Sequence, residues 1–289
     1  MKMGSSRALL LVAVAAAVAG LATANFRDDC DIPWEPQNAW FSNDGNDLSL
    51  KLVTNYSGCM LRTKKQFVYG TVSTLIQLVP GNSAGTVTTY YASSVGDNHD
   101  EIDFEFLGNE TGQPYTIHTN IYANGVGKKE MQFKPWFDPT TGYHNYTISW
   151  SPCMIVWYVD SVPIRVFRNY EASNGVAFPT RRPMYAYSSI WAAEDWAQGG
   201  RVKTDWSKAP FVANYHGINL DICECYSYGG CSTSCPAAAA PYTGACQLSY
   251  AELGQMQWIQ GTYRIYDYCI DPKNWDNGQR PVECGLRQY

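Results

Sequence analysis

The sequence predicts an all-β fold, a sandwich of two antiparallel sheets. Between about residues 48 and 212, short runs rich in β-branched and aromatic residues are separated by turn residues at regular intervals. No amphipathic helix interrupts these runs, which is typical of a sandwich. The 289 residues are enough for one large sandwich domain or two small domains. The expected strands include Phe67–Val79, Thr116–Tyr122, Tyr146–Trp150 and Met154–Val159.

Beyond residue 212 the character of the chain changes. Residues 230–247 are rich in Gly, Ser, Pro and Ala and predict a loop. After it, Tyr250–Gln260 has the composition of a helix, and Tyr263–Cys269 that of a strand. We therefore predict a sandwich domain over residues 25–212 and a cysteine-rich extension over residues 213–289 that packs on it.

The first 24 residues are typical of a secretory signal peptide. Lys2 and Arg7 precede an apolar run from Ala8 to about Leu21, and the small residues Ala22-Thr-Ala24 follow. The run is short and rich in Ala for a membrane anchor, which needs about 20 strongly apolar residues. We therefore expect a secreted protein with no membrane partner. The net charge of −5 and the lack of a basic stripe argue against nucleic acid as a partner.

The segment of residues 99–109 carries the strongest chemical signal. Three acids alternate there with three apolar residues, namely Glu101, Asp103 and Glu105 with Ile102, Phe104 and Phe106. In a strand this alternation places all the acids on one face and all the apolar residues on the other. Like charges on one face destabilise a sheet. The pattern therefore indicates a catalyst that needs two carboxyl groups in different protonation states.

The spacing of the two glutamates favours a retaining glycosidase. Four residues of strand separate their Cα atoms by about 13 Å. Side chains that lean toward each other could close this to about 5 Å, as in retaining enzymes, whereas inverting enzymes leave about 6.5–9.5 Å. Asp103 between them can hydrogen-bond one glutamate and keep it ionised. Its charge and that of the nucleophile are expected to raise the pKa of the other glutamate.

Two other interpretations of this segment are a solvated strand face and a cation site. A calcium ion could use His99, Asp100, Glu101, Asp103 and Glu105, but calcium ligands usually come from a loop, and a regular strand wraps an ion poorly. We expect no metal and no cofactor.

A second motif, Gly81-Asn-Ser83-Ala-Gly85, resembles the nucleophile elbow of serine esterases. That elbow must lead into a helix, whereas the following residues 86–91 are β-prone. The motif therefore predicts a tight turn ahead of a strand that lies beside the acidic one.

The acidic segment resembles the catalytic signature of plant xyloglucan endotransglucosylase/hydrolases, members of the family-sixteen glycoside hydrolases. Further matches follow in family order over about residues 30–284, among them Pro80–Val87, His118–Asn120, Trp136–Pro139, Tyr187–Trp191 and Val202–Trp206. The resemblance implies a β-jelly roll whose concave sheet forms the substrate cleft. It implies Glu101 as nucleophile, Glu105 as acid/base and Asp103 as the residue that orients Glu101. It also implies a monomeric, cofactor-free enzyme of the cell wall or apoplast, with xyloglucan or a related β-glucan as donor and acceptor.

The same resemblance predicts substrate contacts outside the acidic strand. His118, Thr119 and Asn120 are expected to line the cleft, and Lys128, Lys129 and Glu130 match a charged sugar-contacting triplet. The loop with Asp195, Trp196 and either Gly199 or Gly200 is expected to contact glucan, although it is one residue shorter than the usual form. Asn274 stands where the family usually has a substrate-contacting Arg. These departures leave open an endoglucanase that acts on unbranched or mixed-linkage β-glucan. A non-catalytic carbohydrate-binding jelly roll is the alternative from another functional class.

All ten cysteines follow the predicted signal peptide, and oxidation outside the cell favours disulfides over a zinc site. The resemblance implies two bridges in the C-terminal extension, of which Cys269–Cys284 is the later one. The partners among Cys223, Cys225, Cys231 and Cys235 stay open, and Cys30, Cys59, Cys153 and Cys246 have no predicted partner. Of three sequons, at Asn55, Asn109 and Asn145, the resemblance favours a glycan on Asn109.

Overall fold

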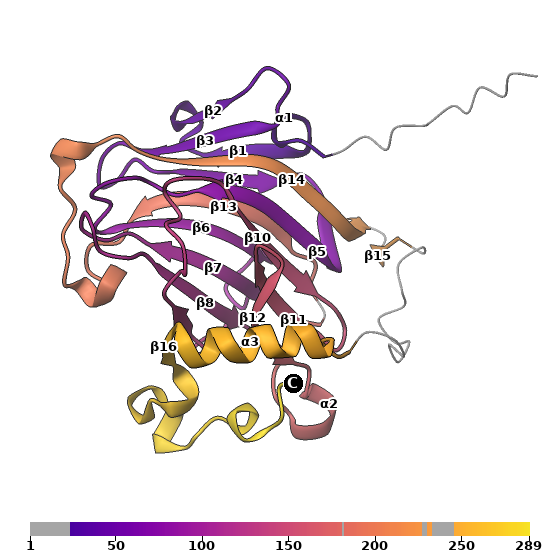
Figure 1. The fold of residues 1–289 in the computed structure, drawn as a ribbon. Coiled ribbons are helices and arrows are strands. Elements are labelled where there is room, and N and C mark those ends of the chain that lie inside the picture. Colours follow the sequence, from indigo (N-terminus) through magenta and orange to yellow (C-terminus); the bar gives the residue numbers. More distant parts are fainter. Residues whose placement is uncertain (1–23, 181, 227–229, 233–245) are drawn as a thin grey trace, which may run out of the picture.

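The computed structural model describes residues 24–180, 182–226, 230–232 and 246–289. Two antiparallel sheets packed on each other form the framework of this part of the chain (Figure 1). The prediction of an all-β sandwich is therefore confirmed. The predicted signal peptide falls almost wholly outside the described residues.

The first sheet carries the acidic strand near its centre. Its strands, in spatial order, are β1 (Cys30–Trp34), β4 (Cys59–Thr63), β13 (Tyr185–Ala192), β6 (Thr86–Ser93), β7 (Glu101–Leu107), β8 (Thr116–Tyr122), β9 (Met131–Phe133) and β16 (Arg264–Asp267). The last strand comes from the C-terminal extension, so the extension completes this sheet.

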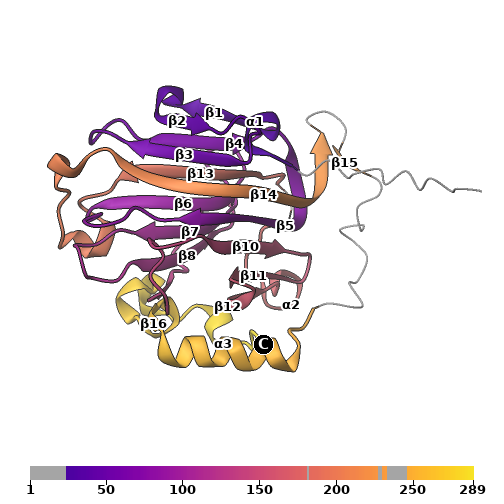
Figure 2. The same ribbon diagram turned by 45° about the horizontal axis from the view of Figure 1, so that its top comes forward.

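The second sheet covers one face of the first (Figure 2). Its strands, in spatial order, are β12 (Val162–Arg168), β11 (Met154–Val159), β10 (His144–Trp150), β5 (Gln66–Gln77), β14 (Phe211–Tyr226), β3 (Asp47–Leu52) and β2 (Ala39–Phe41), with β15 (Gly230–Cys231) beside β14. The described α-helices are α1 (Phe26–Asp29), α2 (Glu171–Asn174) and α3 (Tyr250–Thr262). The boundary that we expected after residue 212 falls inside β14.

The core between the sheets holds the apolar half of the acidic strand. Ile102, Phe104 and Phe106 are fully buried there. Tyr146 of the second sheet packs edge-on against both phenylalanine rings, with ring centroids 5.6 and 4.5 Å apart. Burial of each such side chain is worth about 1.5–3 kcal/mol, which offsets the repulsion among the acids on the other face.

Several elements agree closely with their predicted bounds. β8 and β11 have the bounds that the sequence predicted. The helix predicted over Tyr250–Gln260 is α3, which ends two residues later, at Thr262. Its start is set by a capping box between Ser249 and Glu252. The Gly81–Gly85 motif is a turn that leads into β6, and β6 pairs with β7 as predicted. Ser83 there is buried, and its hydroxyl donates to the carbonyl of Asn109.

Disulfides tie the C-terminal extension together and to the sandwich. Cys269–Cys284 is confirmed, and Cys225 pairs with Cys231. Cys153 pairs with Cys246, a bridge that the sequence did not identify. Cys223 is also disulfide-bonded, whereas Cys235 lies outside the described residues. Within the described part of the chain, Cys30 and Cys59 are free and buried.

Candidate active site

The three acidic side chains of β7 lie on the face of the first sheet that is turned away from the core, called the outer face below. Strand alternation puts them there because Ile102, Phe104 and Phe106 occupy the core. The side chains of Glu101 and Glu105 are each 21% exposed, whereas Asp103 between them is buried. Two carboxyl groups can therefore reach a substrate, and the third can act only through them.

The neighbouring strands supply the surroundings of the acids. On β8, Tyr122 lies opposite Glu101, Asn120 opposite Asp103 and His118 opposite Glu105. On β6, Ser93, Tyr91 and Thr89 lie opposite the same three acids in the same order. From the second sheet, the indole of Trp157 donates to the backbone carbonyl of Asp103 at 2.9 Å. This contact ties the middle of the acidic strand to the other layer.

Asp103 differs from the prediction in its charge. Burial raises its pKa well above the usual range, and the charges of Glu101 and Glu105 add to this effect. A hydrogen bond to Glu101 raises the pKa further, because protonated Asp103 is the donor. Burial therefore favours the protonated form of Asp103, which can donate to Glu101, whereas the sequence argument treated Asp103 as an anion.

Glu105 has the raised pKa that an acid catalyst needs. Burial, followed by the charges of Glu101 and Glu130, raises it to about 8. The sequence argument attributed this rise to the charges of Asp103 and the nucleophile. In the structure, burial is the largest cause of the raised pKa of Glu105. The charge of Glu101 contributes as predicted, and the second charge that contributes is that of Glu130 rather than that of Asp103.

His118 contacts Glu105, the predicted acid/base, as a neutral imidazole ring. Burial, with the charge of Arg165, lowers its pKa to about 3. The amide of Gln132 lies 3.0 Å from Nδ1 and donates to it, so the ring proton is on Nε2. Nε2 is 3.5 Å from Oε2 of Glu105. His118 thus presents an N–H group to the carboxyl group of Glu105.

The predicted glucan-contacting loop docks beside the acidic strand. Trp196 is 42% exposed, and its ring lies edge-on to His118 with centroids 5.3 Å apart. Gln198 holds the loop by donating to the carbonyl of Leu107 at the end of β7, at 3.1 Å. Gly200 is the position that requires glycine, since its φ is +70° and an added Cβ would lie 2.8 Å from the carbonyl oxygen of Asp195. The carboxylate of Asp195 is fully exposed and pairs with Lys203.

Other predicted substrate contacts lie elsewhere. Thr119 is fully buried on the core side of β8 and accepts a hydrogen bond from Arg165. A sugar contact does not fit this placement, because alternation puts only His118 and Asn120 of that motif on the outer face. Lys128 and Lys129 form ion pairs with Asp276 and Glu283 of the C-terminal extension.

Several aromatic residues on the outer face were not assigned a role from the sequence. Tyr91 and Tyr187 stack with centroids 4.9 Å apart, and Trp191 stacks on Trp196 at 6.3 Å. Tyr187 and Trp191 share a face of β13 because they are four residues apart in a strand. The alternation in Tyr187-Ser-Ser-Ile-Trp191 was the signal that could have revealed them.

The structure also shows the contacts of Asn274, of the nearby Arg280 and of the sequon residue Asn109. Asn274 donates hydrogen bonds to the hydroxyl of Tyr266 and to Asp271. Arg280 donates to the carbonyl of Cys269 at 3.1 Å. Asn109 follows β7, and its side-chain nitrogen donates to the carbonyl of Pro114 at 3.0 Å.

Metal ligation was also tested on the geometry. Among the described residues, no group of three or more His, Cys, Asp or Glu side chains is arranged to hold a metal ion. Asp100, which we considered with the acidic strand, accepts a hydrogen bond from the backbone of Asn124 at 2.7 Å.

Comparison with solved structures shows the same fold. A transglycosylase described as "Apo Crh5 transglycosylase" superposes with a TM-score of 0.58 at 21% identity and covers 69% of this chain and 83% of its own. A Bacillus licheniformis β-glucanase superposes with a TM-score of 0.52 at 23% identity and covers 69% and 89%.

Sequence comparison is more specific. "Probable xyloglucan endotransglucosylase/hydrolase protein 12" of Arabidopsis thaliana is 49% identical over 279 residues, 96% of each chain. "Xyloglucan endotransglucosylase protein 1" of Diospyros kaki is 44% identical over 285 residues, 98% of this chain and 96% of the relative. Residues 26–208 match the model of glycosyl hydrolases family 16, and residues 237–284 match that of the xyloglucan endo-transglycosylase C-terminus. The chain therefore belongs to glycosyl hydrolase family 16, among the xyloglucan endotransglucosylase/hydrolases.

Proposed function

We propose that this protein cleaves xyloglucan with retention and transfers the cleaved chain to another xyloglucan end or to water. The acidic strand carries the proposal, because it presents two accessible carboxyl groups with the buried carboxyl group of Asp103 between them. The family and the names of its relatives supply the substrate class.

In the first step the carboxylate of Glu101 attacks the anomeric carbon, and the bond to the leaving sugar oxygen breaks. Glu105, still protonated, gives its proton to that oxygen. Asp103 donates its hydrogen bond to Glu101 and so orients it. The product is a covalent glycosyl-enzyme ester on Glu101.

In the second step Glu105, now a carboxylate, takes a proton from water or from a sugar hydroxyl. The activated oxygen attacks the anomeric carbon and releases Glu101. The same carboxylates serve both outcomes, so the ratio of transfer to hydrolysis depends on how well the acceptor is held. We assign the exposed ring of Trp196, which lies edge-on to His118, as a stacking surface for the acceptor.

The raised pKa of Glu105 predicts how activity depends on pH. The first step needs the protonated form, which is lost as pH rises through about 8. We therefore expect kcat/KM to fall above that pH and to approach a tenfold loss per pH unit. Initial rates measured over a range of buffers, with stability checked at each pH, test this. A profile that stays flat to pH 10 would contradict the assignment of Glu105 as the acid.

The decisive experiment for the function is product analysis on xyloglucan with and without a labelled xyloglucan oligosaccharide. We expect label in long chains when the acceptor is present and a slower fall in chain length when it is absent. An endoglucanase would cleave unbranched or mixed-linkage glucan faster and leave the label in the short oligosaccharide. Asn274, which stands in place of an expected Arg, is the observation that keeps this second function in view. Binding without bond cleavage would indicate a non-catalytic carbohydrate-binding protein.

We also propose that residues 1–24 are removed on secretion and that the protein acts as a glycosylated monomer in the cell wall. The disulfides Cys153–Cys246 and Cys269–Cys284 are consistent with an oxidising compartment. None of the described helices is long and apolar enough to cross a membrane. A glycan on Asn109 is compatible with its hydrogen bond to Pro114, because a glycosylated amide keeps one N–H group.

A further inference from the structure

We propose that Lys129 and Glu283 are positioning residues for the acid/base side of the site, and that together they hold Glu130 beside Glu105. This inference rests on the proposed function for its catalytic meaning. It replaces the predicted sugar contact of Lys129 with an ion pair inside the protein.

The residues of the C-terminal extension that contact Lys129 and Glu130 belong to one segment, residues 267–284, which we call the clamp. The ammonium group of Lys129 pairs with the carboxylate of Glu283, and the hydroxyl of Tyr268 donates to the same carboxylate at 3.3 Å. The backbone N–H of Tyr268 donates to the carbonyl of Glu130 at 3.1 Å. The Cys269–Cys284 disulfide closes the clamp directly beside Tyr268 and Glu283.

The Lys129–Glu283 pair is buried, so it is sensitive to the loss of either partner. The two side chains are 14% and 5% exposed. The ammonium group also lies 5.9 Å from the ring centroids of both Phe167 and Tyr268. Removal of one charge would leave the other poorly solvated, and that charge must neutralise or move toward water.

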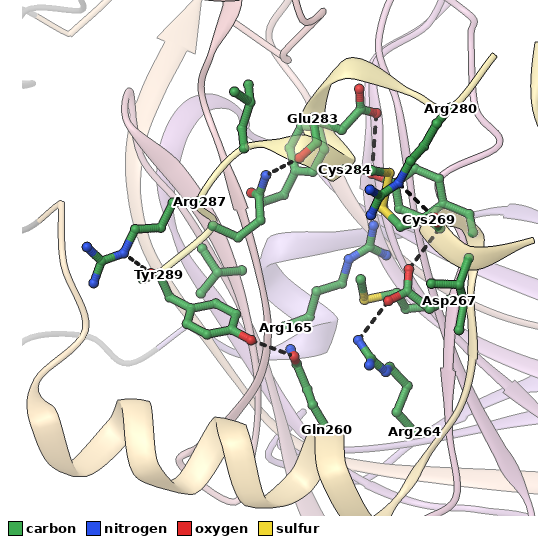
Figure 3. Close-up of a pocket in the computed structure, with 17 residues that line it drawn as sticks. Arg165, Gln260, Arg264, Asp267, Cys269, Arg280, Glu283, Cys284, Arg287 and Tyr289 are labelled. Carbon is green, nitrogen blue, oxygen red and sulfur yellow. Dashed lines mark hydrogen bonds and ion pairs between the residues drawn. A yellow bond between two sulfur atoms is a disulfide. The ribbon is translucent and has the colours of Figure 1, made fainter.

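The clamp surrounds one end of a cavity of about 310 Å³ (Figure 3). Arg165 lines it and is fully buried. One Nη atom of Arg165 donates to the carbonyl of Lys129, and the other donates to the carbonyl of Thr119 on β8. Lys129 is therefore held through its side chain by the clamp and through its backbone by the sandwich.

Glu130 lies between the clamp and β8, the strand next to the acidic strand. His118 pairs with Gln132 and Thr119 with Met131, so the register carries Glu130 alongside Asn120. The N–H of Lys129 donates to the side chain of Asn120 at 3.1 Å, in agreement with this placement. One carboxylate oxygen of Glu130 is buried and has no hydrogen-bond partner among the described residues. Its position is therefore set by its backbone, which the clamp holds.

The groups that face Glu105 come from each neighbouring element. They are Glu101 and Asp103 on its own strand, His118 and Tyr122 on β8, Tyr91 on β6, and Glu130 before β9. Among the neighbours from other elements, Glu130 is the carboxylate that raises the pKa of Glu105. Displacement of Glu130 would remove a negative charge and so lower the pKa of Glu105.

The test compares Glu283→Gln, Lys129→Met and the double variant with the wild type in the full-length mature protein. The pKa of Glu105 is measured by carboxyl ¹³C NMR titration, assigned with Glu105→Gln. We expect each single variant to lower this pKa by about half a unit, and the double variant to add little more. The alkaline limb of kcat/KM on xyloglucan should move to lower pH by the same amount.

A second ion pair between the same two segments provides the matched control. Lys128 and Asp276 lie 2.7 Å apart, but their side chains are 62% and 72% exposed. Asp276→Asn should leave both the NMR titration and the pH profile unchanged, because an exposed pair contributes little.

Three results would overturn the proposal. The first is a lowered melting temperature in Glu283→Gln with an unmoved Glu105 titration, which would make the pair merely structural. The second is a raised acceptor KM in Lys129→Met but not in Glu283→Gln, which would restore Lys129 as a sugar contact. The third is an equal effect of Asp276→Asn. Failure of the wild type to cleave xyloglucan would refute the proposed function alone, since the NMR titration needs no substrate.

Discussion

Glu101→Gln and Glu101→Ala are expected to abolish both transfer and hydrolysis, with kcat lower by about 10⁴-fold or more. Each variant removes the group that would form the covalent intermediate, and neither neighbour on the strand can replace it. Asp103 is buried, and Glu105 is the residue that we propose for proton transfer. Initial rates on xyloglucan with a labelled acceptor measure the loss.

Two further measurements separate chemistry from folding. The melting temperatures of both variants should stay near that of the wild type, because Glu101 is partly exposed. Azide supplied to Glu101→Ala should restore turnover of an activated β-glucoside, since its small anion can enter the space left by the carboxylate. The matched control is Glu110→Gln, which alters an exposed acid just beyond the strand and should keep full activity. Near-normal turnover by either Glu101 variant would remove Glu101 from the role of nucleophile.

Glu105→Gln is expected to have the second largest effect, a fall of about 10²–10⁴-fold on xyloglucan. The amide cannot protonate the leaving sugar oxygen, so bond cleavage loses its acid catalyst. A substrate whose leaving group needs no proton should lose much less in the cleavage step. The residual activity should also lose its decline above about pH 8, because that decline is assigned to Glu105.

The comparison of natural and activated substrates makes this prediction specific. An equal loss on both would show that Glu105 acts on something other than leaving-group protonation. Glu110→Gln again serves as the control. Retention of the alkaline decline in Glu105→Gln would assign the titration to another group.

The local pattern of the sequence was sufficient for the fold class, the limits of β8 and β11, and the acidic face. Alternation of Glu101, Asp103 and Glu105 with apolar residues determines which side chains enter the core, because strand side chains alternate strictly between faces. The same rule, applied to residues 118–120, would have placed Thr119 on the core face and its two neighbours on the outer face. The predicted set of sugar contacts did not apply this rule and therefore included Thr119 wrongly. Cys269–Cys284 was correct by resemblance, whereas Cys153–Cys246 spans 93 residues and has no local signal.

The charge state of the site depends on groups that are distant in the sequence. The pKa of Asp103 is raised because the sheet buries it between two other acids, and burial is a property of the packed structure. Lys129 looks like a sugar contact in the sequence, but Glu283, 154 residues away, takes its charge. Sequence alone determined which chemical groups lie on the strand and which way they point. The tertiary structure decided which of them carry a proton and which are already paired, because both depend on solvation and on partners that only folding brings within reach.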